Sequence, residues 1–152
     1  MKDNIFIFHG TEGYPEWFDV LKKYEQYINE DTILVGHSLG GVFALRVLEQ
    51  LKHPIKAIFL TGTPIGVKPI LNYERDDAFG GFDFDWQNIK NKANHFSVFQ
   101  SDYDAYVSIE NGEQLAKKLG IELTFIPNAG HFNKKAGYLS FPDLLEKIEK
   151  IL

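Results

Sequence analysis

The stretch Thr-Ile-Leu-Val-Gly-His-Ser-Leu-Gly-Gly occupies residues 32–41 and decides how the chain can fold. An apolar run ends at Gly36, and apolar residues recur at helical spacing from residue 42 onward. Ser38 lies between Gly36 and Gly40 in a Gly-x-Ser-x-Gly pattern, which is typical of a nucleophile elbow between a strand and a helix. Such a tight turn needs glycines because the strand and the helix nearly touch. The alternative is an ordinary strand-to-helix turn with Ser38 as the N-cap.

The composition excludes several classes of protein. The 152 residues are 44% hydrophobic and 24% charged, which predicts a single globular domain over residues 1–152. A net charge of −5 argues against a nucleic-acid partner, and no apolar run is long enough for a membrane span. The absence of cysteine excludes disulfides and cysteine catalysis and favours a cytoplasmic location.

Strand and helix patterns alternate along the chain. Such alternation predicts a parallel sheet of about five strands in the order 1-2-3-4-5, with helices on both faces. Residues 66–85 interrupt the pattern with proline, glycine and several aromatics, and we expect an irregular segment there. The expected strands lie at residues 5–8, 33–35, 55–60, 95–100 and 121–126, and the expected helices at 17–30, 42–52, 85–90, 108–120 and 141–152.

Chemistry in parallel sheets gathers at the carboxyl ends of the strands. Ser38 follows the second expected strand, Asp104 the fourth and His131 the fifth. A serine hydroxyl needs a neighbouring base, and an imidazole needs a carboxylate to orient it. Ser38, Asp104 and His131 are therefore our candidate nucleophile, acid and base, with Asp102 as the rival for the acid. Among the five histidines, only His131 follows a late strand at the correct end of the sheet.

Further residues are expected around this centre. The backbone N–H of Leu39 is the first candidate for an oxyanion hole, and that of Thr11, after the first strand, is the second. No spacing indicates a metal site, and no glycine pattern indicates a nucleotide, so we expect neither a metal nor a cofactor. Candidate substrate-binding residues are Gly10, Glu12, His37 and Trp86, although a structural role for His37 fits its position as well.

The chain resembles the small serine hydrolases of the retinoblastoma-binding protein 9 and YdeN type, within the α/β-hydrolase superfamily. The resemblance implies an esterase-like enzyme with Ser38, Asp104 and His131 at the triad positions. It favours Asp104 over Asp102 because the family's acid precedes a Pro-aromatic-Val sequence, although Ala105 stands here in place of proline. The matching segments are Phe-His-Gly at 8–10, Val-Gly-His-Ser-Leu-Gly-Gly at 35–41, Phe-Asp-Phe-Asp-Trp at 82–86, Ser-Asp-Tyr-Asp-Ala-Tyr-Val at 101–107 and Asn-Ala-Gly-His-Phe at 128–132.

The chain departs from this family near its N-terminus. Family members carry a further helix and strand between the first glycine loop and the helix before the elbow strand, whereas here Tyr14-Pro15-Glu16 leads directly into Trp17. The first strand then becomes an apolar edge, and one sheet face is thinly covered, mainly by the final helix. Either surface would suit a homodimer.

Two functions from different classes fit these residues. The first is a carboxylesterase-like serine hydrolase that forms an acyl-enzyme on Ser38 from a small acyl or ester substrate. The alternative is a protein-interaction module on a hydrolase scaffold, with little or no catalytic activity.

Overall fold

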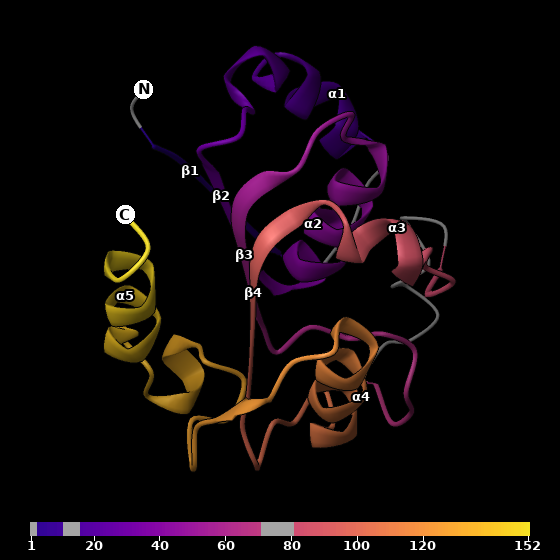
Figure 1. Cartoon of the computed structure of the whole chain (residues 1–152). Coiled ribbons are helices and arrows are strands. Elements are labelled where there is room, and N and C mark those ends of the chain that lie inside the picture. The colour runs from indigo at the N-terminus through magenta and orange to yellow at the C-terminus, as the bar shows by residue number, and fades with distance from the viewer. Residues whose placement is uncertain (1–2, 11–15, 71–80) are drawn as a thin grey trace.

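The computed structural model describes residues 3–10, 16–70 and 81–152. Five parallel strands form one sheet in the order β1-β2-β3-β4-β5, which confirms the predicted topology (Figure 1). All four neighbouring pairs are parallel, so the five strands end at the same edge. The strands are β1 (Asn4–Gly10), β2 (Thr32–Ser38), β3 (Ile55–Thr61), β4 (Ala93–Gln100) and β5 (Thr124–Phe125).

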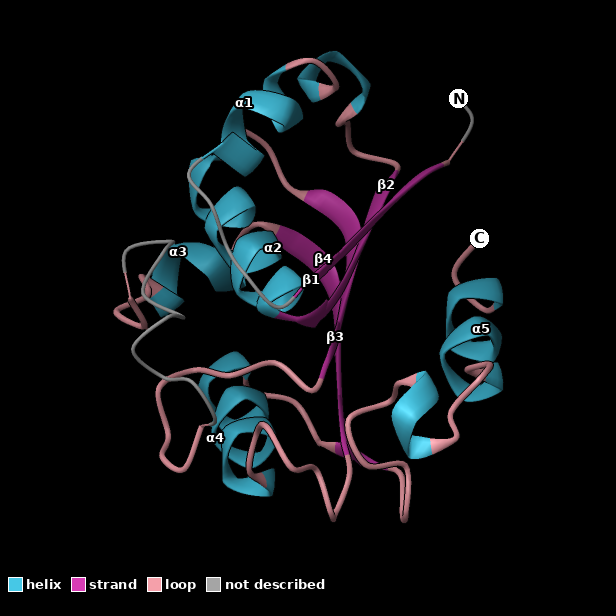
Figure 2. Cartoon of the chain, turned by 180° about the vertical axis from the view of Figure 1, so that it is seen from behind, coloured by secondary structure: helices cyan, strands magenta, loops and turns pink. Residues whose placement is uncertain are grey.

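The helices are distributed unequally over the two faces of the sheet. One face carries α1, α2, α3 and α4, whereas α5 covers the other face together with a short 3-10 turn (Figures 1 and 2). This agrees with the prediction of helices on both faces and thin cover on one. The helices are α1 (Glu16–Lys22), α2 (Leu39–Gln50), α3 (Trp86–Lys90), α4 (Ile109–Leu119) and α5 (Pro142–Glu149), and the 3-10 turns are η1 (Glu25–Tyr27) and η3 (Lys134–Ala136).

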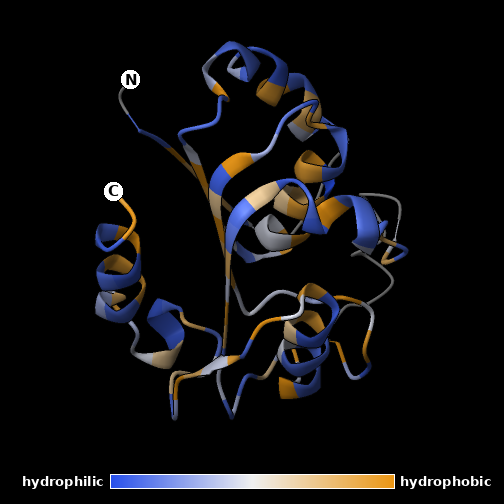
Figure 3. Ribbon diagram, in the orientation of Figure 1, coloured by the Kyte–Doolittle hydropathy of each residue, from blue (hydrophilic) through white to orange (hydrophobic). Residues whose placement is uncertain are grey.

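The alternation of side chains along each strand divides the core into two clusters. On the α2 side, Leu34 and Leu60 pack with Phe43 in the larger cluster. On the α5 side, Ile33 and Phe59 belong to a smaller cluster that α5 reaches through Ile148. Apolar residues run along the sheet and α2, and polar residues mark the outer faces of the helices (Figure 3). The sheet is thus fixed from both sides, which gives the loops at its carboxyl edge a rigid base.

Two elements end earlier or begin later than predicted. The helix expected over 17–30 ends at Lys22, where the i→i−3 bonds of Lys23 to Val20 and of Tyr24 to Leu21 tighten its last turn. The last strand is confined to Thr124–Phe125, because the backbone N–H of Ile121 donates to Ala116 and completes the C-terminal cap of α4. Sequence periodicity does not distinguish such a cap from the beginning of a strand.

The glycines of the elbow allow β1, β2 and α2 to approach one another directly. A Cβ on Gly40 would lie 2.1 Å from the carbonyl oxygen of Phe8 in β1. A Cβ on Gly36 would lie 2.5 Å from the Cα of Gly41. Both obstacles are backbone atoms, which cannot turn aside as a flexible side chain does. These positions therefore need glycine for reasons of space.

We expect Gly40→Ala to lower the free energy of unfolding by about 3 kcal/mol or more, because α2 must move away from β1. Urea denaturation followed by circular dichroism measures this loss. Gly137→Ala is the matched control, since its Cβ meets no atom within 4 Å and its φ of 77° is the only obstacle. The Gly137→Ala substitution should lower the free energy of unfolding by about 1–2 kcal/mol. Equal losses for the two variants would contradict the close approach.

The strand β1 is an edge strand. Within the described ranges it pairs with β2 alone, and its sequence contains no charged residue or proline that would protect the edge. Ile5 and Ile7 are in register with Ile33 and Val35 of the smaller cluster, so they point to the thinly covered face, and they are 45% and 67% exposed. Homodimerisation through this edge or through the neighbouring sheet face stays a prediction.

If the edge mediates a dimer, sedimentation equilibrium should give a dimer for the wild type and a monomer for Ile7→Lys, because lysine opposes strand pairing at this edge. Leu139→Lys is the control, since Leu139 is also exposed but lies in the loop before α5. A monomeric wild type at high concentration would contradict both dimer surfaces.

Candidate active site

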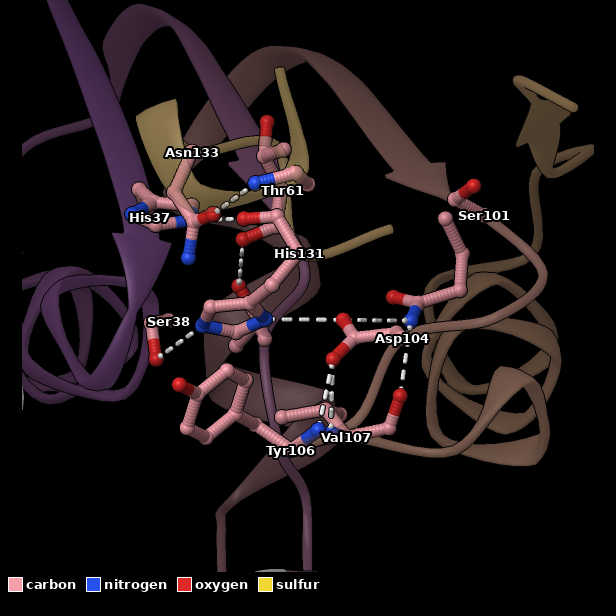
Figure 4. A network of polar contacts seen from close by, with 12 residues as sticks. His37, Ser38, Thr61, Ser101, Asp104, Tyr106, Val107, His131 and Asn133 are labelled. Carbon is pink, nitrogen blue, oxygen red and sulfur yellow. Dashed lines mark hydrogen bonds and ion pairs between the residues drawn. The ribbon is translucent and has the colours of Figure 1, made fainter. Parts of the chain in front are cut away.

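The ends of three strands bring the predicted nucleophile, acid and base together (Figure 4). Ser38 is the last residue of β2 and the N-cap of α2, with φ 56° and ψ −128°. A serine in this unfavourable backbone region indicates a turn held by its surroundings, as a nucleophile elbow requires. Asp104 lies in the loop after β4, and His131 lies in the loop after β5.

The three side chains form one hydrogen-bonded chain. His131 Nε2 lies 3.0 Å from Ser38 Oγ, and His131 Nδ1 lies 2.8 Å from Asp104 Oδ2. A carboxylate only accepts, so Nδ1 carries the proton and Nε2 is left to accept from the serine hydroxyl. The side chain of Asp104 is 1% exposed and that of His131 7%, so little water competes for these bonds.

Backbone groups hold the Asp104 carboxylate in place. Its Oδ1 accepts the N–H groups of Tyr106 and Val107 at 2.9 and 3.0 Å, which leaves Oδ2 for His131. The amide of Gln100, buried at the end of β4, donates to Val107 O at 3.1 Å and approaches Asp104 Oδ2 at 3.4 Å. Gln100 was not among the predicted site residues, because the sequence gives no sign that its amide supports the acid.

Asp102 has a different role from the one considered for it. Its Oδ1 accepts the backbone N–H of Asn128 at 2.5 Å and so holds the loop that carries His131. The neighbouring Ser101 acts in the same way, because its Oγ accepts the N–H of Ala129 at 2.8 Å. The structure thus brings Asp104 to the imidazole and leaves Asp102 as a support of the loop.

The imidazole of His131 lies between two other rings. The ring centroids of His37 and Tyr106 are each 4.8 Å from that of His131, at interplanar angles of 49° and 42°. Burial lowers the pKa of His37, which keeps this neighbour uncharged at neutral pH. Sequence reasoning did not identify Tyr106, although it lies only two residues after the predicted acid.

A glycine opposite the imidazole makes room for the His131–Asp104 bond. Gly62 follows β3 with φ 52°, and a Cβ there would lie 3.3 Å from His131 Nδ1 and 3.5 Å from Asp104 Oδ2. The position after β3, at the carboxyl edge of the sheet, is the signal that could have identified Gly62.

Of the two predicted oxyanion-hole residues, the structure describes Leu39. The backbone N–H of Leu39 stands at the start of α2, where helix N–H groups have no partner within the helix. Gly10 is paired in register with Ser38, so the end of β1 lies beside this serine. Thr11 and Glu12 lie outside the described residues.

The other two predicted substrate-binding residues have contacts of a different kind. The Nε2 atom of His37 lies 2.7 Å from the carbonyl oxygen of His131. Trp86 begins α3 and packs on Phe84, with ring centroids 4.9 Å apart, at the border of the larger core cluster. Neither contact reaches the Ser38 hydroxyl.

The described residues offer neither a metal-binding cluster nor a membrane-spanning helix. Among them, no group of three or more histidine, cysteine or acidic side chains is arranged to hold a metal ion. None of the helices in residues 3–10, 16–70 and 81–152 has the length and apolar character needed to cross a membrane.

The five-stranded parallel sheet, with Ser38 between β2 and α2, has the α/β-hydrolase fold, which solved structures share. The crystal structure of YdeN from Bacillus subtilis matches with a TM-score of 0.80 and 31% identity, over 89% of this chain and 73% of that one. A YdeN-like hydrolase from Pectobacterium atrosepticum matches with a TM-score of 0.69 and 16% identity, over 99% and 90% of the two chains.

Comparisons of sequence give the family. Residues 12–150 match the family model described as serine hydrolase, and the chain therefore belongs to the serine hydrolase family. It is 33% identical over 129 residues to YdeN of Bacillus subtilis strain 168, a protein described as a hydrolase, across 84% of this chain and 67% of YdeN. It is 29% identical over 130 residues to the serine hydrolase RBBP9 of Rattus norvegicus, across 84% and 65%. The chain thus spans about two thirds of the length of these curated relatives.

Proposed function

We propose that this serine hydrolase is a carboxylesterase-like enzyme that forms an acyl-enzyme on Ser38, with Asp104 and His131 completing the triad. The observation that carries the proposal is the relay from Ser38 Oγ through both nitrogens of His131 to Asp104 Oδ2, at 3.0 and 2.8 Å. These are hydrogen-bonding distances, and the chain order Ser, Asp, His is that of α/β-hydrolases.

Acylation begins when Ser38 Oγ attacks the carbonyl carbon of an ester and gives its proton to His131 Nε2. The tetrahedral intermediate bears a negative oxygen, which the N–H of Leu39 and the start of α2 stabilise. When the intermediate collapses, the C–O bond to the leaving group breaks and His131 returns the proton to the departing alkoxide. Asp104 remains a carboxylate throughout and stabilises the imidazolium through Nδ1.

Deacylation repeats these steps with water. His131 takes a proton from a water molecule whose oxygen attacks the acyl carbon. The C–O bond to Ser38 then breaks, and His131 gives this proton to Ser38 Oγ. A carboxylic acid and the free enzyme result.

Two measurements test the proposal directly. A fluorophosphonate probe should label Ser38 in the folded protein, and p-nitrophenyl acetate should be hydrolysed with multiple turnovers. The second candidate function, a protein-interaction module with an idle triad, predicts neither result. Folded protein with a cooperative thermal transition, no labelling and no hydrolysis would favour the module.

Turnover of the ester should fall in acid, because an imidazolium at position 131 cannot accept the proton of Ser38. The measurement is kcat/KM from neutral pH down to about pH 4. A flat profile would contradict the role of His131 as base.

Loss of activity in acid must be distinguished from unfolding, so the pH profile of kcat/KM needs a stability control. Burial lowers the pKa of His37 in the folded state, so the unfolded chain binds this proton first as the pH falls. The contribution of neutral His37 to stability is complete above its ordinary pKa of 6.5 and is lost as the pH falls from there through the lowered pKa. The free energy of unfolding is therefore measured at each pH.

A further inference from the structure

The loop that carries His131 has few regular contacts of its own. It connects the two-residue strand β5 to α5, and four of its residues have left-handed backbones: Asn128, Gly130, Phe132 and Gly137, with φ of 60°, 53°, 49° and 77°. No strand pairing fixes residues 127–132, so the packing of Ala129 and Phe132 in the smaller core cluster and side-chain hydrogen bonds set the position of the loop. Ser101 and Asp102 supply two of them, and both bind the loop to the end of β4.

His37 connects the same loop to the strand of the nucleophile. It precedes Ser38 in β2, which is paired with β1 on one side and with β3 on the other. Its Nε2 lies 2.7 Å from the carbonyl oxygen of His131, a residue 94 positions further along the chain. A carbonyl only accepts, so Nε2 must carry the proton and donate it. Its ring centroid lies 4.8 Å from that of the His131 imidazole, at an interplanar angle of 49°.

We infer that His37 is a positioning residue, which sets the distance between Ser38 Oγ and His131 Nε2 by holding the backbone carbonyl of His131. This inference rests on the proposed function, since it assigns a role within the same triad. Ser38 and His37 are consecutive residues of β2, a strand that is paired on both sides. The bond from His37 therefore fixes the position of His131 relative to the strand that carries Ser38. Tyr106 supports the other side of the imidazole.

This role differs in its consequences from substrate binding. A side chain that touches substrate equally in the ground and transition states changes KM, whereas one that aligns the base with the nucleophile changes kcat. A displacement of about 1 Å at a reacting group can lower the rate about 100-fold.

Two variants of nearly the same shape test the inference. His37→Gln retains an N–H donor in about the place of Nε2, whereas His37→Met replaces this group with a thioether. We expect His37→Met to lower kcat for p-nitrophenyl acetate by about 10- to 100-fold with KM within about twofold. The rate of fluorophosphonate labelling should fall in parallel. The kcat of His37→Gln should stay within about fivefold of the wild type.

The outcomes separate this inference from the proposed function. If the wild type is neither labelled nor active, the proposed function fails. If the wild type is active and His37→Met has the same kcat as His37→Gln, the positioning role is wrong. A rise in KM with kcat unchanged would assign His37 to substrate binding and also overturn it.

A measurement on the wild type does not depend on the folding of any variant. Nitrogen-15 NMR of the histidine rings reports which nitrogen carries the proton in the folded protein at neutral pH. We expect the Nε2–H form for His37, because only that form can donate to the carbonyl oxygen of His131. The Nδ1–H form would exclude the bond and overturn the inference.

Discussion

Ser38→Ala should lower kcat for ester hydrolysis by about 10⁴- to 10⁶-fold and abolish fluorophosphonate labelling. The alanine removes the only group that can form the acyl-enzyme in the proposed mechanism, and the imidazole of His131 then has no hydroxyl to deprotonate. The remaining rate comes from water in the site, helped by the N–H of Leu39. Steady-state kinetics with p-nitrophenyl acetate and intact-mass analysis after labelling measure the two effects.

The control for this variant is another serine. Ser140→Ala changes an exposed residue in the loop before α5 and should leave both labelling and turnover unchanged. The stability of Ser38→Ala should be close to that of the wild type, because the backbone strain at residue 38 is the same in both and, in the part of the chain that the structure describes, the hydroxyl bonds to His131. Labelling that persists in Ser38→Ala would show that the probe reacts elsewhere, and the assignment of the nucleophile would then be wrong.

The sequence predicted the position of these three residues through two independent signals. The glycines around Ser38 indicated the elbow, and the parallel topology placed the ends of β2, β4 and β5 at one edge of the sheet. The structure shows why the glycines are needed, since Gly36 and Gly40 meet backbone atoms. The catalytic roles of the three residues remain a proposal that the variants test.

The residues that hold the three side chains in position were harder to predict from the sequence. The contact of His37 with the His131 carbonyl joins residues 94 positions apart and depends on how a loop packs. One signal did exist: strand alternation places His37 on the same face of β2 as Ile33 and Val35, the face that packs with Phe132 of the His131 loop. For Gln100 and Tyr106 the sequence offers no comparable pattern, because their contacts with Asp104 and His131 are set by loop geometry.

The second large effect is expected for Asp104→Asn, which should lower kcat by about 10⁴-fold while the protein stays folded. The backbone N–H groups of Tyr106 and Val107 require an oxygen at the Oδ1 position, so the amide oxygen must take that place. The amide NH₂ then faces His131 Nδ1 and donates to it. The imidazole is driven to the tautomer with its proton on Nε2, which cannot accept a proton from Ser38.

Asp102→Asn is the matched control, because it makes the same chemical change two residues away. The amide oxygen can still accept the N–H of Asn128, so the loop of His131 keeps its tether and kcat should stay within about fivefold of the wild type. Steady-state kinetics and thermal unfolding of both variants, measured side by side, decide between the two carboxylates. A larger loss of kcat in Asp102→Asn than in Asp104→Asn would mean that the hydrogen bond from His131 Nδ1 to Asp104 Oδ2 does not orient the base.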